Sequence, residues 1–239
     1  MIHRWACAAA LAAISCQATT LTPPPACAVG SLASYIALGG VGCSIGPDVT
    51  VFSFQFISTG FGGATLATAN NIQVTPVFVG GADARLTFVS DLFNVATGQR
   101  ALYEINYQAD PHPIIDSFDD EMVTFTPVAP GSARIDTSLC IGNLFAGSAC
   151  NPPGTASTVS VFHLGIPPGQ LTSGITFAPV ALLGVRNRID LDAIRGGSAD
   201  FRSFSNTIGT TLPEPGSILL FSSGLAIIWI QRRRRPPKA

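Results

Sequence analysis

Carboxylates are concentrated in one short segment of the sequence, from Asp110 to Glu121. Oxygen-rich segments suit calcium, which accepts roughly six to eight oxygen ligands in a tolerant geometry. The spacing does not match the D-x-[DN]-x-[DN]-G loop, however, and Phe118 interrupts it. A solvated acidic loop explains the same residues, so we assign no metal and no cofactor, and calcium binding stays open. The ionisable residues of the segment are Asp110, His112, Asp116, Asp119, Asp120 and Glu121.

Histidine bases that could support hydrolysis are scarce. Beyond the N-terminal region there are His112, in a proline-flanked loop, and His163, in an alternating pattern that puts it on the strand face opposite Phe162. A Ser-His-Asp triad needs a serine that is activated by a histidine, which a carboxylate orients in turn. Nothing in the sequence selects one serine over another. We therefore expect no catalytic residues and keep a secreted hydrolase only as a second alternative.

Exposed aromatic rings beside planar polar groups would indicate sugar binding. Both tryptophans, Trp5 and Trp229, lie close to the ends of the chain. Tyr103 and Tyr107 share one strand face because of their even spacing, so this face is the candidate platform for a saccharide. A carbohydrate-binding module for a polysaccharide made by the cell itself is therefore the first alternative function.

Short strands must position these groups. In residues 48–57, Phe52, Phe54 and Phe56 alternate with polar residues, which is the period of a half-buried strand. Glycine and proline clusters separate similar runs, and no long segment has the period of a helix. The sequence predicts an all-β ectodomain, an antiparallel β-sandwich or a jelly-roll-like fold. The further predicted strands are residues 72–79, 85–90, 101–108, 122–128, 133–141, 158–164, 175–180, 185–191 and 201–207.

The last 27 residues have the pattern of a membrane signal. They begin with Pro213-Glu214-Pro215, and 17 uncharged residues then separate Glu214 from Arg232-Arg233-Arg234-Arg235. At ~1.5 Å per residue this apolar stretch gives about 25 Å of helix, close to the lower limit for a hydrocarbon core of about 30 Å. The four arginines form a stop-transfer signal, since each is costly to bring into hydrocarbon.

The triplet, the apolar helix with its Gly224-Leu225-Ala226 step and the terminal arginine cluster together resemble the PEP-CTERM sorting signal. That signal is found on exported proteins of Gram-negative bacteria that make exopolysaccharide. The resemblance covers residues 213–239 and implies recognition by a membrane-embedded exosortase, cleavage near the triplet, and release or transfer of the ectodomain. An ordinary C-terminal anchor that is never cut predicts the same topology and is the alternative.

The N-terminus has the pattern of a signal peptide. Arg4 supplies a positive charge, residues 5–16 are uncharged and apolar, and small residues favour cleavage after Ala18. Lipidation of Cys16 is the alternative. The predicted domains are a signal peptide (1–18), an ectodomain (19–212) and a sorting signal (213–239). Within the ectodomain, residues 19–30 look like an extended leader and residues 207–212 like a linker.

Four cysteines lie in the predicted ectodomain and allow three pairings. The pairing with the shortest loops joins Cys27 to Cys43 and Cys140 to Cys150. A zinc site is the alternative, but no C-x-x-C pair is present and export favours oxidation.

The charge of the ectodomain excludes nucleic acid as a partner. Six of the 13 basic residues and one of the 14 acidic residues lie in the targeting segments, so residues 19–213 carry a net charge of −6 and no lysine. Such a surface cannot neutralise phosphates. We expect an exosortase, the membrane and a polysaccharide as partners. The predicted function is a structural or adhesive protein, anchored in the inner membrane with its ectodomain in the periplasm and later at the cell surface or in the extracellular matrix.

Overall fold

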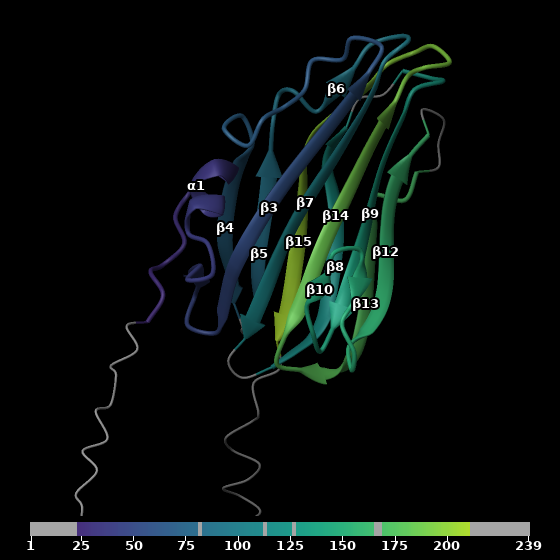
Figure 1. The fold of residues 1–239 in the computed structure, drawn as a ribbon. Coiled ribbons are helices and arrows are strands. Elements are labelled where there is room, and N and C mark those ends of the chain that lie inside the picture. The colour runs from purple at the N-terminus through teal and green to yellow at the C-terminus, as the bar shows by residue number, and fades with distance from the viewer. Residues whose placement is uncertain (1–22, 81–82, 112–113, 126–127, 165–168, 211–239) are drawn as a thin grey trace, which may run out of the picture.

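The computed structural model describes residues 23–80, 83–111, 114–125, 128–164 and 169–210. These residues form two antiparallel β-sheets packed face to face (Figure 1). The predicted all-β sandwich is therefore confirmed. The predicted signal peptide and sorting signal lie outside the described residues. Within the described part, no helix is long and apolar enough to span a membrane.

The two sheets are called front and back after their positions in Figure 1. The front sheet has the strand order β12 (Thr155–His163), β9 (Ser132–Ile141), β14 (Leu183–Asp192), β7 (Arg100–Pro111), β3 (Val49–Phe61) and β2 (Cys43–Ile45). The back sheet has the order β1 (Gly30–Ser31), β4 (Gln73–Gly80), β5 (Asp83–Val89), β15 (Ala199–Thr210), β8 (Ile115–Phe125) and β13 (Thr172–Val180), and β6 (Asn94–Val95) also pairs with β15. The remaining elements are the helix α1 (Leu32–Ala37) and the hairpin of β10 (Phe145–Ala146) and β11 (Ala149–Cys150).

Strand alternation builds the core between the sheets. In β7 every second residue is buried, from Ala101 to Pro111, and the residues between them face outward. Aromatic rings fill much of the interior: the Tyr107 ring centroid lies 5.3 Å from that of Phe54 in the front sheet and 6.3 Å from that of Phe88 in the back sheet. Full burial of one such side chain contributes about 1.5–3 kcal/mol, so these rings hold the sheets together.

All ten predicted strands are present, with different ends. The largest difference is in β8, which begins at Ile115 although the sequence predicted a start at residue 122. β15 runs to Thr210, so the linker predicted at 207–212 begins inside the sheet. Of the leader predicted at 19–30, the described part from residue 23 on is tied to the fold, because the Cys27 amide donates to the Ser44 carbonyl at 2.8 Å.

A β-bulge interrupts β3 and corrects the predicted face of one phenylalanine. Phe52 pairs with Gln108 and Gln55 pairs with Asn106, so two residues of β3 lie opposite one residue of β7. Ser53, at the bulge, has a positive φ of 55°. Phe54 is buried in the core, but Phe52 lies on the outer side, so the two do not share one face as the alternation predicted.

Both predicted disulfides are present, Cys27–Cys43 and Cys140–Cys150, with Cα–Cα distances of 4.9 and 5.2 Å. Cys27–Cys43 fastens the N-terminal segment to the front sheet. Cys140–Cys150 fastens the β10–β11 hairpin to β9. Cystines of this kind are typical of domains that fold in an oxidising compartment, which is consistent with export.

Candidate functional site

The acidic segment between Asp110 and Glu121 is not the loop that the sequence predicted. Its second half belongs to β8, where Asp119 and Glu121 face outward and Asp120 is buried. Alternation thus divides the carboxylates between the two sides of the sheet. Among the described residues, no three His, Cys, Asp or Glu side chains lie close enough together to hold a metal ion. His112 lies outside the described residues.

The tyrosine platform predicted for sugar binding is wrong. Tyr103 and Tyr107 do share a face, but it is the inner face, and each is only 1% exposed. The Tyr103 hydroxyl accepts a hydrogen bond from the Ala67 amide at 3.3 Å and donates one to the Leu92 carbonyl at 3.2 Å. Burial raises the pKa of both phenols. These residues stabilise the core and cannot stack on a sugar.

A buried polar network joins the sheets around Asn206 of β15. The Asn206 amide oxygen accepts hydrogen bonds from the Tyr107 hydroxyl and the Asn187 amide, each at 3.0 Å. Its amide nitrogen donates to Asp120. Thr137 donates to the other end of Asn187, at 2.7 Å. Asp120 Oδ2 has no partner in the described structure, and burial raises the pKa of this carboxyl to about 7.

His163, the last residue of β12, is half-buried, and the alternation of the strand places it on the face opposite to that of Phe162. One spacing was overlooked in the sequence: Gly42-Cys43-Ser44-Ile45-Gly46 matches the G-x-S-x-G pattern of serine hydrolases. That pattern is functional on a sharp strand-to-helix turn. Here Ser44 lies within β2, and its neighbour Cys43 is bonded to Cys27. This serine is therefore not on a nucleophile elbow.

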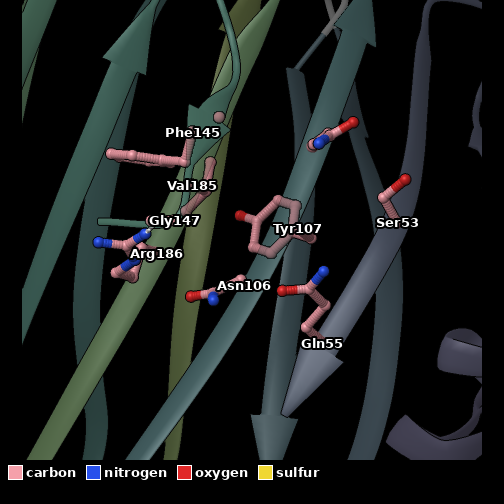
Figure 2. A pocket seen from close by; sticks show the side chains of 10 residues that line it. Ser53, Gln55, Asn106, Tyr107, Phe145, Gly147, Val185 and Arg186 are labelled. Atoms are coloured by element: carbon pink, nitrogen blue, oxygen red, sulfur yellow. Dashed lines mark hydrogen bonds between the residues drawn. The ribbon is translucent and has the colours of Figure 1, made fainter. Parts of the chain in front are cut away.

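The candidate site is a hollow of about 120 Å³ on the outer face of the front sheet, which we call the front hollow (Figure 2). Strands β3, β7 and β14 form its floor, and the β10–β11 hairpin forms one wall. None of its lining residues is a His, Cys, Asp or Glu, so it offers hydrogen bonding rather than acid–base chemistry. The lining residues are Ser53, Gln55, Asn106, Tyr107, Gln108, Phe145, Gly147, Gly184, Val185 and Arg186.

Local backbone features place these side chains. The bulge turns Ser53 and Gln55 toward the outer face of β3, and Figure 2 shows Gln55 reaching toward Asn106 on β7. Gly184 of β14 allows the hairpin to lie close to the sheet. A Cβ atom at this position would lie 3.1 Å from Phe145 Cδ2 and 3.3 Å from the Cβ of Cys140, which leaves little room for a side chain.

Arg186 joins the hairpin to the sheet. Its guanidinium lies 4.5 Å from the centre of the Phe145 ring and donates hydrogen bonds to the carbonyls of Gly147 and Ser148, the latter at 3.2 Å. Its Nε atom lies 3.5 Å from Glu104 Oε1 of β7. Arg186 therefore holds the ring of Phe145 in place above the outer face of the sheet.

Two polar atoms at the hollow have unused hydrogen-bonding capacity. The Asn106 amide nitrogen donates to Glu104 at 2.8 Å, but its amide oxygen is buried without a partner among the described residues. The Arg186 Nε atom is also buried without a hydrogen-bond partner among the described residues, because its 3.5 Å approach to Glu104 Oε1 lacks hydrogen-bond geometry. A buried polar atom without a partner costs about 1–3 kcal/mol, so a ligand or water that supplies partners gains affinity here.

A second depression of about 180 Å³ extends the site along the same strands. Leu102 and Glu104 of β7 face outward there, beside Ile57 of β3 and Arg188 of β14. In the register of β14 with β7, Arg186 lies opposite Asn106 at the front hollow. Two residues further along β14, Arg188 lies opposite Glu104 at the second depression. The two depressions therefore follow one another along β7 and form a track on the outer face.

The comparison with protein-family models finds no match for this sequence, and the comparison with curated proteins finds none either. The likeness of residues 213–239 to a sorting signal therefore stays a prediction. The function has to be argued from the geometry of the site.

Proposed function

We propose that this chain is an exported structural or adhesive protein of the cell envelope or extracellular matrix, and that its ectodomain binds polysaccharide in the front hollow. An exosortase recognises residues 213–239 and cleaves near Pro213-Glu214-Pro215. Before cleavage, the apolar stretch and Arg232-Arg233-Arg234-Arg235 hold the chain in the inner membrane. The role of the ectodomain is binding, without catalysis.

The observation that carries the binding proposal is the unused capacity of Asn106 and Arg186 beside the ring of Phe145. Saccharide rings present hydroxyl groups, which both donate and accept hydrogen bonds, next to apolar C–H faces. Amide side chains such as Gln55 can match both functions of a hydroxyl, and an aromatic ring covers the apolar face. The described lining has no carboxylate, and the charge of its one cation, Arg186, is offset by Glu104, so the front hollow favours a neutral sugar.

The continuation of the front hollow along β7 supports a polymer as ligand. A single sugar would fill the front hollow alone, whereas a chain would also contact Ile57 and Leu102 in the second depression. The cystines Cys27–Cys43 and Cys140–Cys150 support export. Figure 1 supports the anchoring, because the described domain begins and ends toward the same end of the sandwich.

The test is a glycan array probed with the full-length protein in detergent. We expect retention of neutral oligosaccharides, and a loss of about tenfold or more in affinity for Gln55→Ala and Asn106→Ala. Gln73→Ala is the matched control, because Gln73 is exposed on β4 of the back sheet, away from the hollow. The binding proposal fails if no glycan is retained, or if the control weakens binding as much as the hollow variants do.

A further inference from the structure

A second and larger hollow lies on the opposite outer face of the sandwich. Its volume is about 420 Å³, and strands β5, β15, β8 and β13 form its floor. We call it the back hollow. Its lining residues have polar side chains except for Gly174, and they are Arg85, Asp119, Asp120, Glu121, Thr172, Ser173, Gly174 and Thr207.

Sheet register builds the back hollow from two rows of outward-facing residues. In the first row, Asp119 of β8 lies between Thr207 of β15 and Gly174 of β13. In the second row, Glu121 lies between Ser205 and Thr172. Because Asp119 and Glu121 are two positions apart on one strand, both carboxylates point to the same side of the sheet.

Gly174 makes room for the Asp119 carboxylate. A Cβ atom added at Gly174 would collide with Asp119 Oδ1, so the carboxylate lies directly against the backbone of β13. Burial and the negative charge of nearby Asp83 raise the pKa of Asp119, so this carboxylate gains from a positive charge placed beside it.

The charges facing the back hollow are not balanced. Arg85 comes from β5, Asp119 and Glu121 come from β8, and β13 contributes only hydroxyl groups and a glycine. The Arg85 Nε atom donates to the Thr207 hydroxyl at 3.1 Å, and Asp83 of β5 lies close enough to Asp119 to affect its charge. Two outward-facing carboxylates are thus set against the single positive charge of Arg85, so the site has an excess of negative charge and favours a cationic ligand.

A hydroxyl group beside these carboxylates also lacks a partner. Ser205 is 1% exposed, and its Oγ atom has no hydrogen-bond partner among the described residues. Ser205 pairs across the strands with Glu121, on the same outward row. Its neighbours in β15, Phe204 and Asn206, face the core, so the Ser205 side chain points to the side of the sheet that carries the hollow.

We propose that the back hollow is a second binding site, which takes the ammonium group of an amino sugar between Asp119 and Glu121 while hydroxyl groups of the same sugar contact Thr172 and Thr207. The proposal goes beyond the function proposed above and stands on different residues. Among the described residues, these carboxylates are not grouped closely enough for three of them to hold one metal ion, which favours an ammonium group over a divalent cation. A lysine peptide fits less well, because a lysine side chain carries no hydroxyl groups that could contact Thr172 and Thr207.

Two sites on opposite faces give the molecule a further capacity. The sheets of a sandwich lie about 10 Å apart, so two polymer chains bound to the two outer faces cannot contact each other through the protein. Each molecule then bridges two chains, and a matrix that contains many such molecules is cross-linked without any covalent bond.

The experiment measures the binding of glucosamine oligomers and of N-acetylglucosamine oligomers of equal length to the full-length protein in detergent, by calorimetry at about pH 6, where the amino groups of glucosamine are protonated. We expect the glucosamine oligomers to bind at least tenfold more tightly, and the difference to shrink at high salt. Asp119→Asn and Glu121→Gln should each reduce glucosamine binding about tenfold. Asp91→Asn is the matched control, because the Asp91 side chain is 89% exposed on a distant turn.

The outcomes separate this proposal from the front site. Gln55→Ala should leave glucosamine binding unchanged, and Asp119→Asn should leave the binding of neutral oligosaccharides unchanged. Equal binding of the two oligomers overturns the proposal, as does an equal loss in Asp91→Asn. Tighter binding of an oligolysine peptide than of glucosamine oligomers also overturns it, because the hollow would then select a basic peptide.

Discussion

Asp120 and Asn206 lie opposite each other on β8 and β15, and the Asn206 amide donates a hydrogen bond to the Asp120 carboxylate in the interior of the sandwich. This pair places an ionisable group where the hydrophobic core would otherwise continue. Desolvation by burial raises the pKa of Asp120 to about 7, and Asp120 Oδ2 has no partner among the described residues. Ionisation of Asp120 therefore costs stability in the folded state.

The first prediction concerns this pH dependence. The folded state holds the proton of Asp120 up to about pH 7, whereas in the unfolded chain the carboxyl ionises near its model value of 3.8. The contribution of this group to stability is thus fully present below about pH 4, and is lost as the pH rises through 7. The slope from this single group is up to about 1.4 kcal/mol per pH unit.

Chemical denaturation of the wild type and of Asp120→Asn from pH 4 to pH 8 measures this effect. The difference in unfolding free energy between the two proteins should shift in favour of the variant as the pH rises. A constant difference across the range would contradict the assigned role of Asp120.

The second prediction concerns the two core tyrosines. Tyr107→Phe removes the hydrogen bond to Asn206 and leaves a buried amide oxygen with one partner fewer, so we expect a loss of about 1–2 kcal/mol. Tyr103→Ala leaves a large cavity and should cost about 3–5 kcal/mol. Urea denaturation checks both values. Although Tyr107 is among the residues that line the front hollow, its ring packs in the core against Phe54 and Phe88, so molecules of Tyr107→Phe that remain folded should bind glycans normally. A selective loss of binding would place the ring at a ligand site.

The third prediction compares the two disulfides. Replacing either cysteine pair by serine should lower the unfolding free energy by about 3 kcal/mol. Only Cys140→Ser with Cys150→Ser should also weaken neutral glycan binding, because this disulfide fastens the hairpin that carries Phe145. Cys27→Ser with Cys43→Ser is the matched control for general destabilisation. Equal binding losses in both double variants would show that the hairpin has no special part in the front hollow.

The fourth prediction concerns processing. Mass spectrometry of the protein recovered from the producing cell should find an N-terminus after Ala18 and a C-terminus close to Pro213-Glu214-Pro215. Replacing the Pro-Glu-Pro triplet by alanines should cause the unprocessed chain to accumulate in the membrane. A mature chain that still carries Arg232-Arg233-Arg234-Arg235 would contradict cleavage and favour a permanent anchor.

The strands could be predicted from the sequence because a period of two is a local property of the chain. The cystines could be predicted because Cys140 and Cys150 are close in the sequence. The short helix α1 escaped notice, since one turn capped by Ser31 leaves too few residues for a helical period to appear. The acidic residues 115–121 were assigned to a loop because their charges suggested solvent, yet pairing with β15 and β13 holds them in a strand.

Neither hollow could be predicted from the sequence, because each depends on which strands become neighbours in the sheet. Gln55, Asn106 and Arg186 are far apart in the sequence and meet only through the order β3-β7-β14. Outward-facing amides give no sequence signal of their own, since any exposed strand face carries polar residues. Tyr107 shows a different limit of the sequence. Its even spacing from Tyr103 correctly placed both rings on one face of the strand, but the spacing does not tell which face of the sheet is buried.

The bulge at Ser53 makes one position of β3 dispensable to the sheet. Val51 faces the core before the bulge and Phe54 after it, so excision of Ser53 alone would join two segments that are already in phase. Removal of one residue from a regular part of β3, away from the bulge, would invert the faces of the residues beyond the cut. Ser53 interrupts the regular pairing of β3 with β7. Its amide donates a hydrogen bond to the Gly39 carbonyl at 2.8 Å, and the residue lines the front hollow. A shortened strand should thus keep the architecture and lose part of its recognition surface.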